Sequence, residues 1–490
     1  MKRVLFMIKN IRDQRYGILC LAAYLKERGH ALDYVRVRGD ESLPEVLRKV
    51  DEFRPDYLAV TAMSGEVRSL LSILKGVKAS HPELYTVLGG PHATFSPQVV
   101  EEPVIDAICR GEGEEAFAEF LEKHPDGDYL SVRNFSFAGP GGKAVHNPLR
   151  PLGDVDSFPI PDYDFIPRQV GEKIVVFVSR SCLFSCAYCF NKEYRDMYRD
   201  AGEGGTYRHM SVDRALRELT FLKEKYSGRF KYFYFQDDVF PTRLEWLREF
   251  SERYPPEVGL PFHVGLNPFL IKEEPISLLK KAGCFSMNLA IESGSPRVRR
   301  IMNRPRMSND DLVRACRTVR RHGIYIDTQN IIMSPTETVE EAKQTLELNI
   351  ACGVDNGVVG KFQPYPGTRM AKFAVEKGLV AESEIMEKLP ENYHWESILK
   401  FDGEEAVQMD NLLHLFSFTI RYPFMKKIVY AVLPYRWDRL FHRIDDQFWM
   451  TFTHRGMEAK HESSFMRELR LHLIFLKRLV FPKGKSEFVY

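Results

Sequence analysis

The sequence predicts an α/β protein with a helical carboxyl-terminal region, and three observations along its 490 residues support this prediction. Strand-like and helix-like patterns alternate regularly over residues 1–125. Six apolar, strand-like runs then recur within residues 171–375, at spacings that leave room for helices between them. Beyond residue 376, apolar residues repeat at steps of three and four, as on one face of a helix. We therefore predict domains at residues 1–130, 171–375 and 376–490, with a linker that contains a hairpin at 131–170.

The first domain is predicted to hold five parallel strands separated by helices. Such regular alternation implies a doubly wound, Rossmann-like sheet, with ligand-binding loops at the carboxyl ends of its strands. The predicted strands are Val4–Ile8, Leu32–Val37, Tyr57–Ala62, Tyr85–Leu88 and Ala107–Cys109, and the predicted helices are Ile18–Arg28, Leu43–Phe53 and Leu70–Val77.

Glycine and small polar residues follow three of these strands. The strand ends run into Thr61-Ala-Met-Ser-Gly65, Gly89-Gly-Pro-His-Ala-Thr94 and Gly111-Glu-Gly-Glu114. Paired glycines allow a ligand to approach the backbone closely, and free amides there can meet polar groups. The G-x-G-x-x-G pattern of dinucleotide-binding proteins is absent after the first strand.

The linker is predicted to contain a hairpin and then a stiff, extended segment. Residues Asn134–Asn147 form the hairpin, turning at Gly139-Pro-Gly-Gly142. The run Pro159-Ile-Pro-Asp-Tyr-Asp164 favours extended backbone, because each proline restricts itself and the residue before it.

The six runs of residues 171–375 predict an incomplete, TIM-type (β/α)₆ barrel. Polar residues and glycine collect just after most of the runs, and the carboxyl ends of barrel strands are the functional face of this architecture. The predicted strands are Ile174–Val178, Phe230–Phe235, Pro261–Leu266, Phe285–Ile291, Ile324–Met333 and Val358–Phe362.

Three cysteines in a C-x₃-C-x₂-C pattern, Cys182, Cys186 and Cys189, follow the first barrel strand. A loop of this length can hold three thiolates around one iron–sulfur cluster and leave the fourth iron without a protein ligand. A zinc site would need a fourth ligand, and none stands at the customary spacing. Disulfides are not expected in a chain without a secretion signal. The other five cysteines are predicted to be buried thiols: Cys20, Cys109, Cys284, Cys316 and Cys352.

Cysteine spacing, together with Tyr188 before the last cysteine, resembles the signature loop of the radical S-adenosylmethionine (SAM) enzymes. The order of later motifs is also similar: Asp237-Asp238, Ile291-Glu-Ser-Gly-Ser295, Pro335-Thr-Glu-Thr338 and Pro364-Tyr-Pro-Gly-Thr368. The resemblance implies a 4Fe-4S cluster on the three cysteines, with SAM on its open iron. The residues implied to contact SAM are Tyr188, Asp237, Asp238, Glu292, Ser293 and Asn330.

The amino-terminal domain resembles the cobalamin-binding domain that precedes the barrel in many radical SAM enzymes. The Asp-x-His-x-x-Gly motif of other cobalamin proteins is not present, and Arg15 stands where its histidine would fall. His92 is an alternative cobalt ligand, although a histidine after Gly-Gly-Pro commonly makes an ordinary loop hydrogen bond. The residues implied to contact cobalamin are Arg15, Ser64, Gly89, Gly90, Gly111, Glu112 and Gly113.

These resemblances imply a cobalamin-dependent radical SAM methyltransferase acting on an unactivated carbon, with methylcobalamin as the methyl donor and an external electron donor such as flavodoxin or ferredoxin. One alternative is a related enzyme that closes or contracts a ring, or oxidises its substrate, without methyl transfer. A transfer-RNA methylthiotransferase would need three more cysteines in the first domain, which has only Cys20 and Cys109. A third alternative is a non-catalytic cobalamin sensor.

The composition is that of an ordinary globular protein, with 44% hydrophobic and 28% charged residues and a net charge of +2. Reduced thiols, an oxygen-sensitive cluster and the absence of a long apolar stretch lead us to expect a cytoplasmic protein. The charge is uneven, because residues 421–490 hold 14 basic and 7 acidic residues.

The basic carboxyl-terminal region has two interpretations. It is either a helical cap that closes the barrel mouth, or an interfacial surface that touches a membrane and reaches a lipid-like substrate. Nucleic acid is not an expected partner, because bulky aliphatic residues interrupt the basic ones. The residues concerned are Met466, Leu469, Leu473, Leu476 and Val480, the basic Arg467, Arg470, Lys477 and Arg478, and the aromatic Tyr430, Tyr435, Trp437, Phe441, Phe448 and Trp449.

Overall fold

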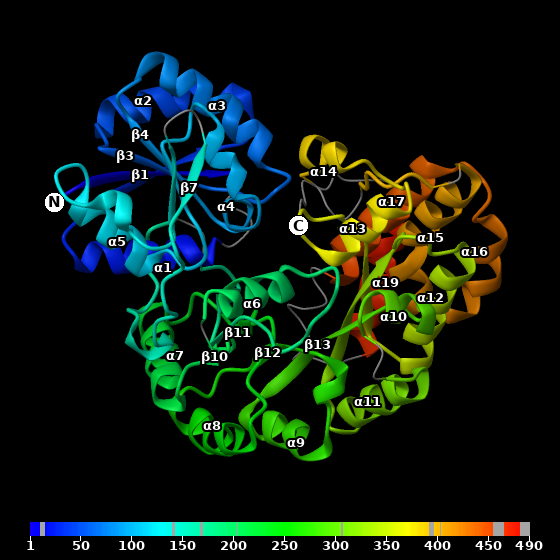
Figure 1. Ribbon diagram of the computed structural model, residues 1–490. Helices are drawn as coiled ribbons and strands as arrows, with labels where there is room; N and C mark the ends of the chain where they lie inside the picture. The colour runs from blue at the N-terminus through cyan, green and yellow to red at the C-terminus, as the bar shows by residue number, and fades with distance from the viewer. Residues whose placement is uncertain are drawn as a thin grey trace.

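A computed structural model shows an amino-terminal α/β domain, an open half-barrel and a carboxyl-terminal group of helices (Figure 1). The turn predicted at Gly139–Gly142 falls largely outside the described residues, as do the side chains of residues 465–470 and 480 in the last helix. The described residues are 1–9, 15–139, 143–166, 170–202, 204–304, 307–391, 396–401, 403–453 and 465–480.

The amino-terminal domain is a doubly wound sheet with strand order β2-β1-β3-β4-β5-β6-β7. The first five strands are parallel, and β6 and β7 are antiparallel to their neighbours. The predicted hairpin therefore extends this sheet instead of standing in a linker. The strands are β1 (Arg3–Lys9), β2 (Ala31–Val37), β3 (Tyr57–Thr61), β4 (Tyr85–Gly89), β5 (Ala107–Cys109), β6 (Phe135–Ala138) and β7 (Ala144–His146).

Alternate residues of β1 pack on opposite faces of this sheet. Phe6 belongs to the core under helices α1 and α5, whereas Met7 belongs to the core under α2 and α3. Successive side chains of a strand point to opposite faces of the sheet. Because both faces of β1 are buried, its sequence is a continuous apolar run. The helices are α1 (Tyr16–Glu27), α2 (Leu43–Phe53), α3 (Val67–Ser80), α4 (Pro91–Phe95) and α5 (Glu114–Lys123).

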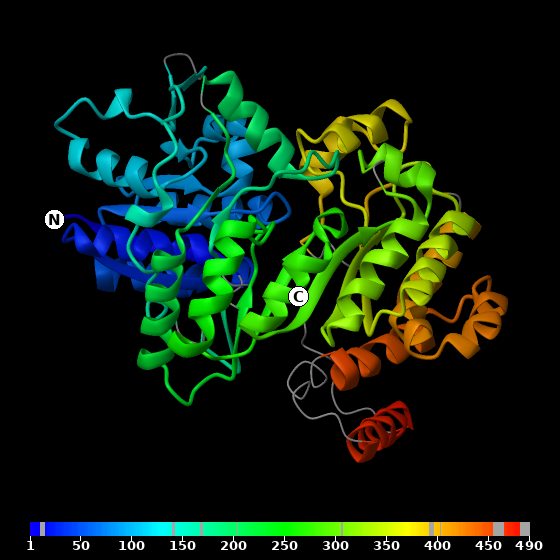
Figure 2. The same ribbon diagram turned by 90° about the horizontal axis from the view of Figure 1, so that it is seen from below.

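The second domain is an open, six-stranded parallel sheet with order β15-β14-β13-β12-β11-β8. Its helices cover the convex side, and the amino-terminal domain lies over the open side, with α6 between the two (Figures 1 and 2). The predicted incomplete barrel is thus confirmed. Its strands are β8 (Lys173–Val176), β11 (Tyr232–Phe235), β12 (Phe262–Leu266), β13 (Cys284–Glu292), β14 (Tyr325–Ile332) and β15 (Asn356–Lys361). Its helices are α6 (Phe190–Asp200), α7 (Val212–Lys225), α8 (Leu244–Glu257), α9 (Glu273–Ala282), α10 (Pro296–Ile301), α11 (Asn309–Arg321), α12 (Val339–Cys352) and α13 (Arg369–Glu376), and the short strands β9 (Ser179–Arg180) and β10 (Arg208–His209) pair with each other.

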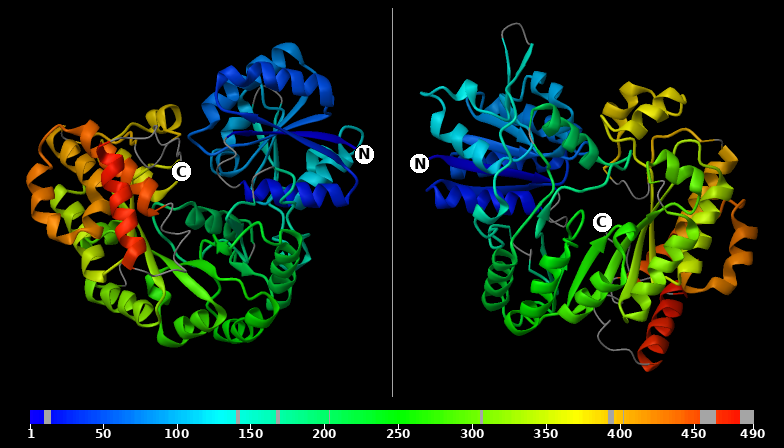
Figure 3. Two further views of the ribbon diagram at one scale, coloured as in Figure 1. Left: turned by 180° about the vertical axis from the view of Figure 1, so that it is seen from behind. Right: turned by 60° about the horizontal axis from the view of Figure 1, so that its bottom comes forward.

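The helices from α15 onward do not cap the barrel mouth, whereas α14 reaches the amino-terminal domain, where the Glu387 carbonyl accepts from Arg68 Nη1 at 3.0 Å. Helix α15 packs on the outer face of the edge strand β15, where Ser417 Oγ donates to the Gly357 carbonyl at 2.6 Å. The later helices lie beyond it, on the side of the barrel away from the amino-terminal domain (Figures 1 and 3). No helix in the described ranges is both long and apolar enough to cross a bilayer. The elements are α14 (Glu382–Lys388), α15 (Gly403–Arg421), η7 (Pro423–Met425), α16 (Lys426–Val432), α17 (Asp438–Phe448), the π-helical turn η8 (Trp449–Thr453) and α19 (Phe465–Val480).

Candidate active site

The cysteine loop lies at the carboxyl end of β8 and leads directly into α6. Its middle is fixed by backbone bonds, because the Ala187 N–H donates to Met302 and the Ala187 carbonyl accepts from Met370. From α6, the Arg195 guanidinium donates to the carbonyls of Cys182 and Phe184 at 3.2 and 3.0 Å. The loop is therefore held in one shape by its surroundings.

Each cysteine sulfur has an N–H donor nearby. The Phe184 amide lies 3.4 Å from Cys182 Sγ, the Asn191 amide 3.5 Å from Cys189 Sγ, and Arg304 Nη1 3.7 Å from Cys186 Sγ. Burial raises the pKa of Cys182 to about 11 and that of Cys189 to about 12, so that iron must supply the charge that makes them thiolates.

The donor set fits a cluster better than a single ion. Among the described residues, no three His, Cys, Asp or Glu side chains converge closely enough to ligate one metal ion. Zinc would need such convergence, whereas in a cluster each thiolate binds a different iron. The three sulfurs would hold three irons of a 4Fe-4S cluster.

Tyr188 and Glu292 form a buried polar group with Arg304, a residue that the sequence analysis missed. The Tyr188 hydroxyl donates to Glu292 Oε1 at 2.7 Å, and Arg304 Nη1 lies 3.2 Å from that hydroxyl and 3.6 Å from the same carboxylate oxygen. Burial raises the pKa of Glu292, and the nearby Arg304 opposes this rise. Two residues predicted to contact SAM thus lie together beside the cysteine loop.

Asp237 and Asp238 have different surroundings. Asp237 Oδ1 accepts from the Val178 and Ser179 amides at 2.9 and 2.5 Å, which fixes the backbone just before the cysteine loop. Its Oδ2 is buried and has no hydrogen-bond partner among the described residues. Burial raises the pKa of Asp237 to about 7. Asp238 instead lines the cavity between the two domains and accepts a hydrogen bond from the Asn191 side chain. Of the two aspartates it is therefore the better placed to contact a bound cation.

Ser293 and Asn330 are bonded to the helix layer. Ser293 is fully buried, and its hydroxyl lies 3.4 Å from Thr345 Oγ1 of α12. Asn330 and Asn349 of α12 are paired, with Asn349 Nδ2 donating to Asn330 Oδ1 at 2.8 Å. Ser293, directly after β13, and Asn330, on the outward face of β14, are thus both held by α12, and their contact with SAM stays a prediction. Gln329, next to Asn330, is exposed on the opposite face.

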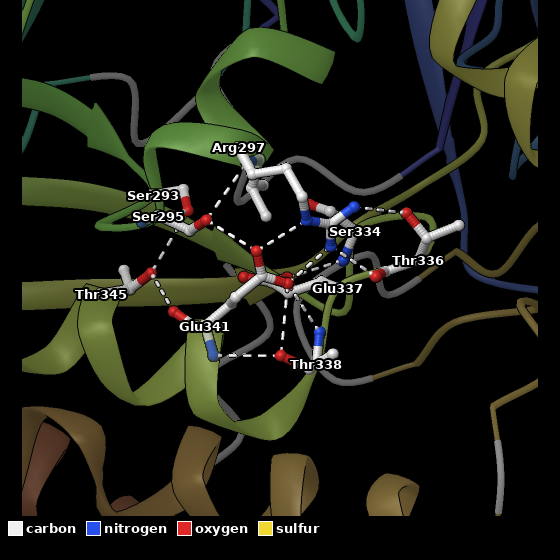
Figure 4. Close-up of polar contacts among 10 residues, drawn as sticks. Ser293, Ser295, Arg297, Ser334, Thr336, Glu337, Thr338, Glu341 and Thr345 are labelled. Atoms are coloured by element: carbon white, nitrogen blue, oxygen red, sulfur yellow. Dashed lines mark hydrogen bonds and ion pairs between the residues drawn. The ribbon is translucent and has the colours of Figure 1, made fainter.

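Glycine in the Glu292-Ser-Gly-Ser295 segment has a packing role. A Cβ built on Gly294 would lie 2.1 Å from the Gln344 carbonyl, so α12 approaches the backbone closely at this point. Around it, Glu341 accepts from Ser295 Oγ at 2.8 Å and from Arg297 Nε at 2.8 Å, and Arg297 Nη2 donates to the Thr336 carbonyl at 2.6 Å (Figure 4). This network joins the loops after β13 and β14.

The same network contains a buried glutamate, Glu337. Its Oε2 accepts from the Ser334 amide at 2.9 Å (Figure 4), while Oε1 is buried and has no hydrogen-bond partner in the part of the chain that the structure describes. Burial raises the pKa of Glu337 to about 8. The folded protein keeps this proton at pH values where the unfolded chain has lost it. The resulting stability is complete below about pH 4.5 and is lost as the pH rises through about 8.

We expect Glu337→Gln to stabilise the protein at high pH only. The free energy of unfolding, measured with urea, should be close to that of the wild type near pH 5 and exceed it by roughly 4–5 kcal/mol near pH 9, because glutamine has no charge to bury. Glu340→Gln, an exposed change on the same loop–helix junction, is the control and should alter stability by less than about 0.5 kcal/mol at both pH values. An equal effect of Glu337→Gln at both pH values would contradict the assignment.

A cavity of about 620 Å³ lies between the amino-terminal domain and the cysteine loop. One wall is formed by the ends of β3, β4 and β5, and the other by residues 177–181, 190, 191 and 238 of the half-barrel. Most of its lining is apolar. Of the residues predicted to contact cobalamin, six line this cavity: Arg15, Gly89, Gly90, Gly111, Glu112 and Gly113.

Ser64 and His92 do not line the cavity. His92 is 2% exposed, and its Nδ1 lies 3.2 Å from Ser64 Oγ. Burial lowers the pKa of His92 to about 4, so the ring is neutral. The contact between His92 and Ser64 is the ordinary loop hydrogen bond that the sequence analysis gave as the alternative to cobalt ligation. Arg15 lines the cavity and forms an ion pair with Glu66.

Gly89 and Gly90, at the end of β4, differ in why the position can or must be glycine. Gly90 has a φ of 89°, and a Cβ there would lie 2.7 Å from Thr61 Oγ1, so the fold itself requires glycine. A Cβ on Gly89 would meet no atom closer than 4.0 Å. Glycine at position 89 is therefore not required by packing, and leaves room for a ligand on the cavity wall.

We expect Gly89→Ala to weaken cobalamin binding about tenfold without changing the thermal midpoint, because the methyl group takes space that the ligand needs. Equilibrium titration of the apoprotein with cobalamin measures the affinity. Gly171→Ala is the matched control, since a Cβ there also meets no atom within 4 Å and Gly171 is not among the cavity-lining residues. Unchanged affinity in Gly89→Ala would place cobalamin elsewhere.

Charged and aromatic contacts join the two domains at the cavity. Arg180, two residues before Cys182, forms ion pairs with Glu112 at 3.0 Å and Glu114 at 2.7 Å. Phe190, directly after Cys189, stacks on Phe95 of α4 with ring centroids 4.4 Å apart. The first domain is thus held against both ends of the cysteine loop, by residues 111–114 at one end and by α4 at the other.

This fold and site define a class of protein: an enzyme with an open iron–sulfur centre in a half-barrel, facing a ligand-binding Rossmann-like domain. Residues 176–348 match the radical SAM superfamily, and residues 14–121 match the B12-binding domain. The chain belongs to the radical SAM enzymes that carry a cobalamin-binding domain, and its cofactors are a 4Fe-4S cluster, SAM and cobalamin.

Similar proteins agree with this assignment. An uncharacterized methyltransferase of Pyrococcus horikoshii is 28% identical over 377 residues, covering 74% of this chain and 79% of that protein. The anaerobic magnesium-protoporphyrin IX monomethyl ester cyclase of Rubrivivax gelatinosus is 27% identical over 368 residues, covering 71% and 63%. The cobalamin-dependent SAM radical enzyme OxsB, solved with aqua-cobalamin bound, shares the fold with a TM-score of 0.66 and 15% identity, covering 98% of this chain and 80% of that one.

Proposed function

We propose that this enzyme transfers a methyl group to an unactivated carbon of an organic, lipid-like substrate. The observation that carries the proposal is the shared cavity wall, because it brings the glycine loops of the cobalamin-binding domain to the edge of the cysteine loop. When bound, cobalamin supplies a transferable methyl group, and the reduced cluster with SAM supplies the radical that removes a hydrogen atom from the substrate. Similarity to a methyltransferase over most of both chains supports this reaction.

The side chains at the cavity hold and orient; they are not required as acids or bases. The charges of Arg15, Arg180 and Arg214 on the cavity wall are each balanced by a glutamate partner. A wall of paired charges and apolar groups suits a large ligand of low net charge. Fixed domains of this kind increase the rate by holding the reacting groups in register.

In the proposed overall reaction, one C–H bond of the substrate, two SAM molecules and two electrons give the methylated product, S-adenosylhomocysteine, methionine and 5′-deoxyadenosine. The electrons come from an external donor of the flavodoxin or ferredoxin type. The hydrogen atom of the substrate ends in 5′-deoxyadenosine, and the methyl group comes from the sulfonium of one SAM.

Anaerobic reconstitution with iron, sulfide and cobalamin tests the proposal. The loaded enzyme is incubated with a strong reductant, SAM carrying a deuterated methyl group, and extracts of lipids or of polar metabolites. We expect S-adenosylhomocysteine and 5′-deoxyadenosine in similar amounts and a product that carries the labelled methyl group. If neither S-adenosylhomocysteine nor 5′-deoxyadenosine forms, the protein is a sensor and not an enzyme.

A cyclase-type reaction is the second candidate, favoured by the 27% identity to the protoporphyrin ester cyclase. It would yield 5′-deoxyadenosine without S-adenosylhomocysteine, and a product that contains no label.

A further inference from the structure

Residues 423–440, which include η7, α16 and the start of α17, form a surface with many large apolar side chains in solvent. We call it the 423–440 surface. Its exposed apolar residues are Phe424 (79% exposed), Ile428 (56%), Tyr435 (54%), Trp437 (49%) and Leu440 (48%). Large exposed apolar groups gathered in one short segment are typical of a binding surface.

The fold holds this segment in place. Val429 of α16 and Leu433, directly after this helix, are buried. From α15, the buried Asn411 Nδ2 donates to the carbonyls of Leu433 and Tyr435 at 2.7 and 2.8 Å. The rings of Tyr435 and Trp437 stack with centroids 5.2 Å apart. The apolar side chains therefore face outward from a firmly anchored segment.

Basic residues lie among these apolar ones. Lys427, Arg436 and Arg439 are exposed, and in the described part of the chain none of them forms an ion pair. Asp438 is the one acidic residue of the 423–440 surface. A surface that combines aromatic rings, aliphatic side chains and unneutralised positive charge is complementary to an anionic bilayer.

Other occupants fit less well. An electron donor must come close to the cluster, but α15 and the edge strand β15 stand between the 423–440 surface and the rest of the half-barrel (Figures 1 and 2). A second copy of this chain would bring like charges together, and the cores of homodimer interfaces are depleted of charged residues.

We propose that the 423–440 surface binds the surface of an anionic phospholipid bilayer, which would bring the enzyme to a membrane-resident substrate. Within the basic carboxyl-terminal region, for which membrane contact was predicted, this places the contact at the 423–440 surface, ahead of the last helix. In that last helix, Leu473 and Leu476 are exposed, whereas Phe441 and Phe448 of α17 are core residues. The inference does not depend on methyl transfer, because membrane binding is measured without turnover.

The test uses the full-length, reconstituted enzyme and sedimentable vesicles of phosphatidylcholine, with or without phosphatidylglycerol. We expect binding to the anionic vesicles that weakens with salt, and at least tenfold weaker binding to the neutral ones. Removing one basic charge should weaken binding about fivefold. The double variant Lys427→Glu/Arg439→Glu should therefore bind at least tenfold more weakly. We expect a loss of the same size for Phe424→Ser/Trp437→Ser, which removes two of the exposed apolar side chains.

Two matched surface changes in the amino-terminal region serve as controls. Leu130 is 55% exposed and Lys75 is exposed on α3, and Leu130→Ser and Lys75→Glu should leave vesicle binding unchanged. Thermal midpoints verify folding, and Ile428→Ser/Leu440→Ser replaces the apolar pair if that variant does not fold. The proposal is overturned if the wild type does not bind anionic vesicles, or if the surface variants bind these vesicles as tightly as the wild type does. It is also overturned if these changes abolish only a concentration-dependent dimer seen by sedimentation velocity.

Discussion

Replacing Cys182, Cys186 and Cys189 together by alanine is expected to abolish the reductive cleavage of SAM and to leave cobalamin binding intact. The three sulfurs are the predicted ligands of the cluster, and the predicted cobalamin-binding residues belong to a separate sheet, one face of which has a core of its own. Iron content, the visible absorption of the cluster and 5′-deoxyadenosine formation should all fall to background. Titration with cobalamin should give the wild-type affinity.

The matched control for this change is Cys284→Ala. Cys284 is 1% exposed at the start of β13, far from the functional ends of the strands, and the substitution removes a buried thiol of the same kind. It should cost some stability but retain the cluster and SAM cleavage. A triple variant that still cleaves SAM, or a wild type that takes up zinc in preference to iron, would refute the cluster assignment.

Local sequence patterns predicted the strands and the cysteine loop well, because both depend on neighbouring residues. Apolar runs define β1, β3 and β4, and the spacing of the cysteines sets the size of their loop. The side of the sheet on which a residue lies was less obvious. Asn330 was predicted to contact SAM, but it lies on the outward side of β14, whereas the adjacent Gln329 is exposed on the opposite side. Asn330 shares its side with Ile326 and Ile332, which pack outward, and that parity was a usable signal.

Contacts between segments far apart in the chain could not be predicted from the sequence. Arg304 and Cys186 are 118 residues apart, and no local pattern around Arg304 marks it as a neighbour of the cluster loop. The pairing of β6 with β5 was missed for a similar reason, since a hairpin has the same local pattern whether or not it joins a larger sheet. Aromatic residues of the carboxyl-terminal region divide into core and surface only through the packing of α15 against α17.

Arg304→Met is expected to lower both stability and the reactivity of the cluster, through two different contacts. The change leaves the buried Glu292 without its cation, which should cost about 3–5 kcal/mol of unfolding free energy. It also removes the N–H donor and positive charge 3.7 Å from Cys186 Sγ. Loss of a hydrogen bond to a cluster sulfur should shift the reduction potential to a more negative value and slow SAM cleavage about 10–100-fold.

The double variant Arg304→Met/Glu292→Gln separates these effects. Neutralising Glu292 removes the unpaired buried charge, so the free energy of unfolding measured with urea should recover most of its loss. The potential, measured by redox titration of the cluster with electron paramagnetic resonance, should stay shifted. Arg300→Met, an exposed change on α10 four residues before Arg304, should alter neither quantity. Recovery of both quantities in the double variant would mean that Arg304 acts only by neutralising Glu292, and a normal potential in the single variant would mean that its contact with Cys186 does not tune the cluster.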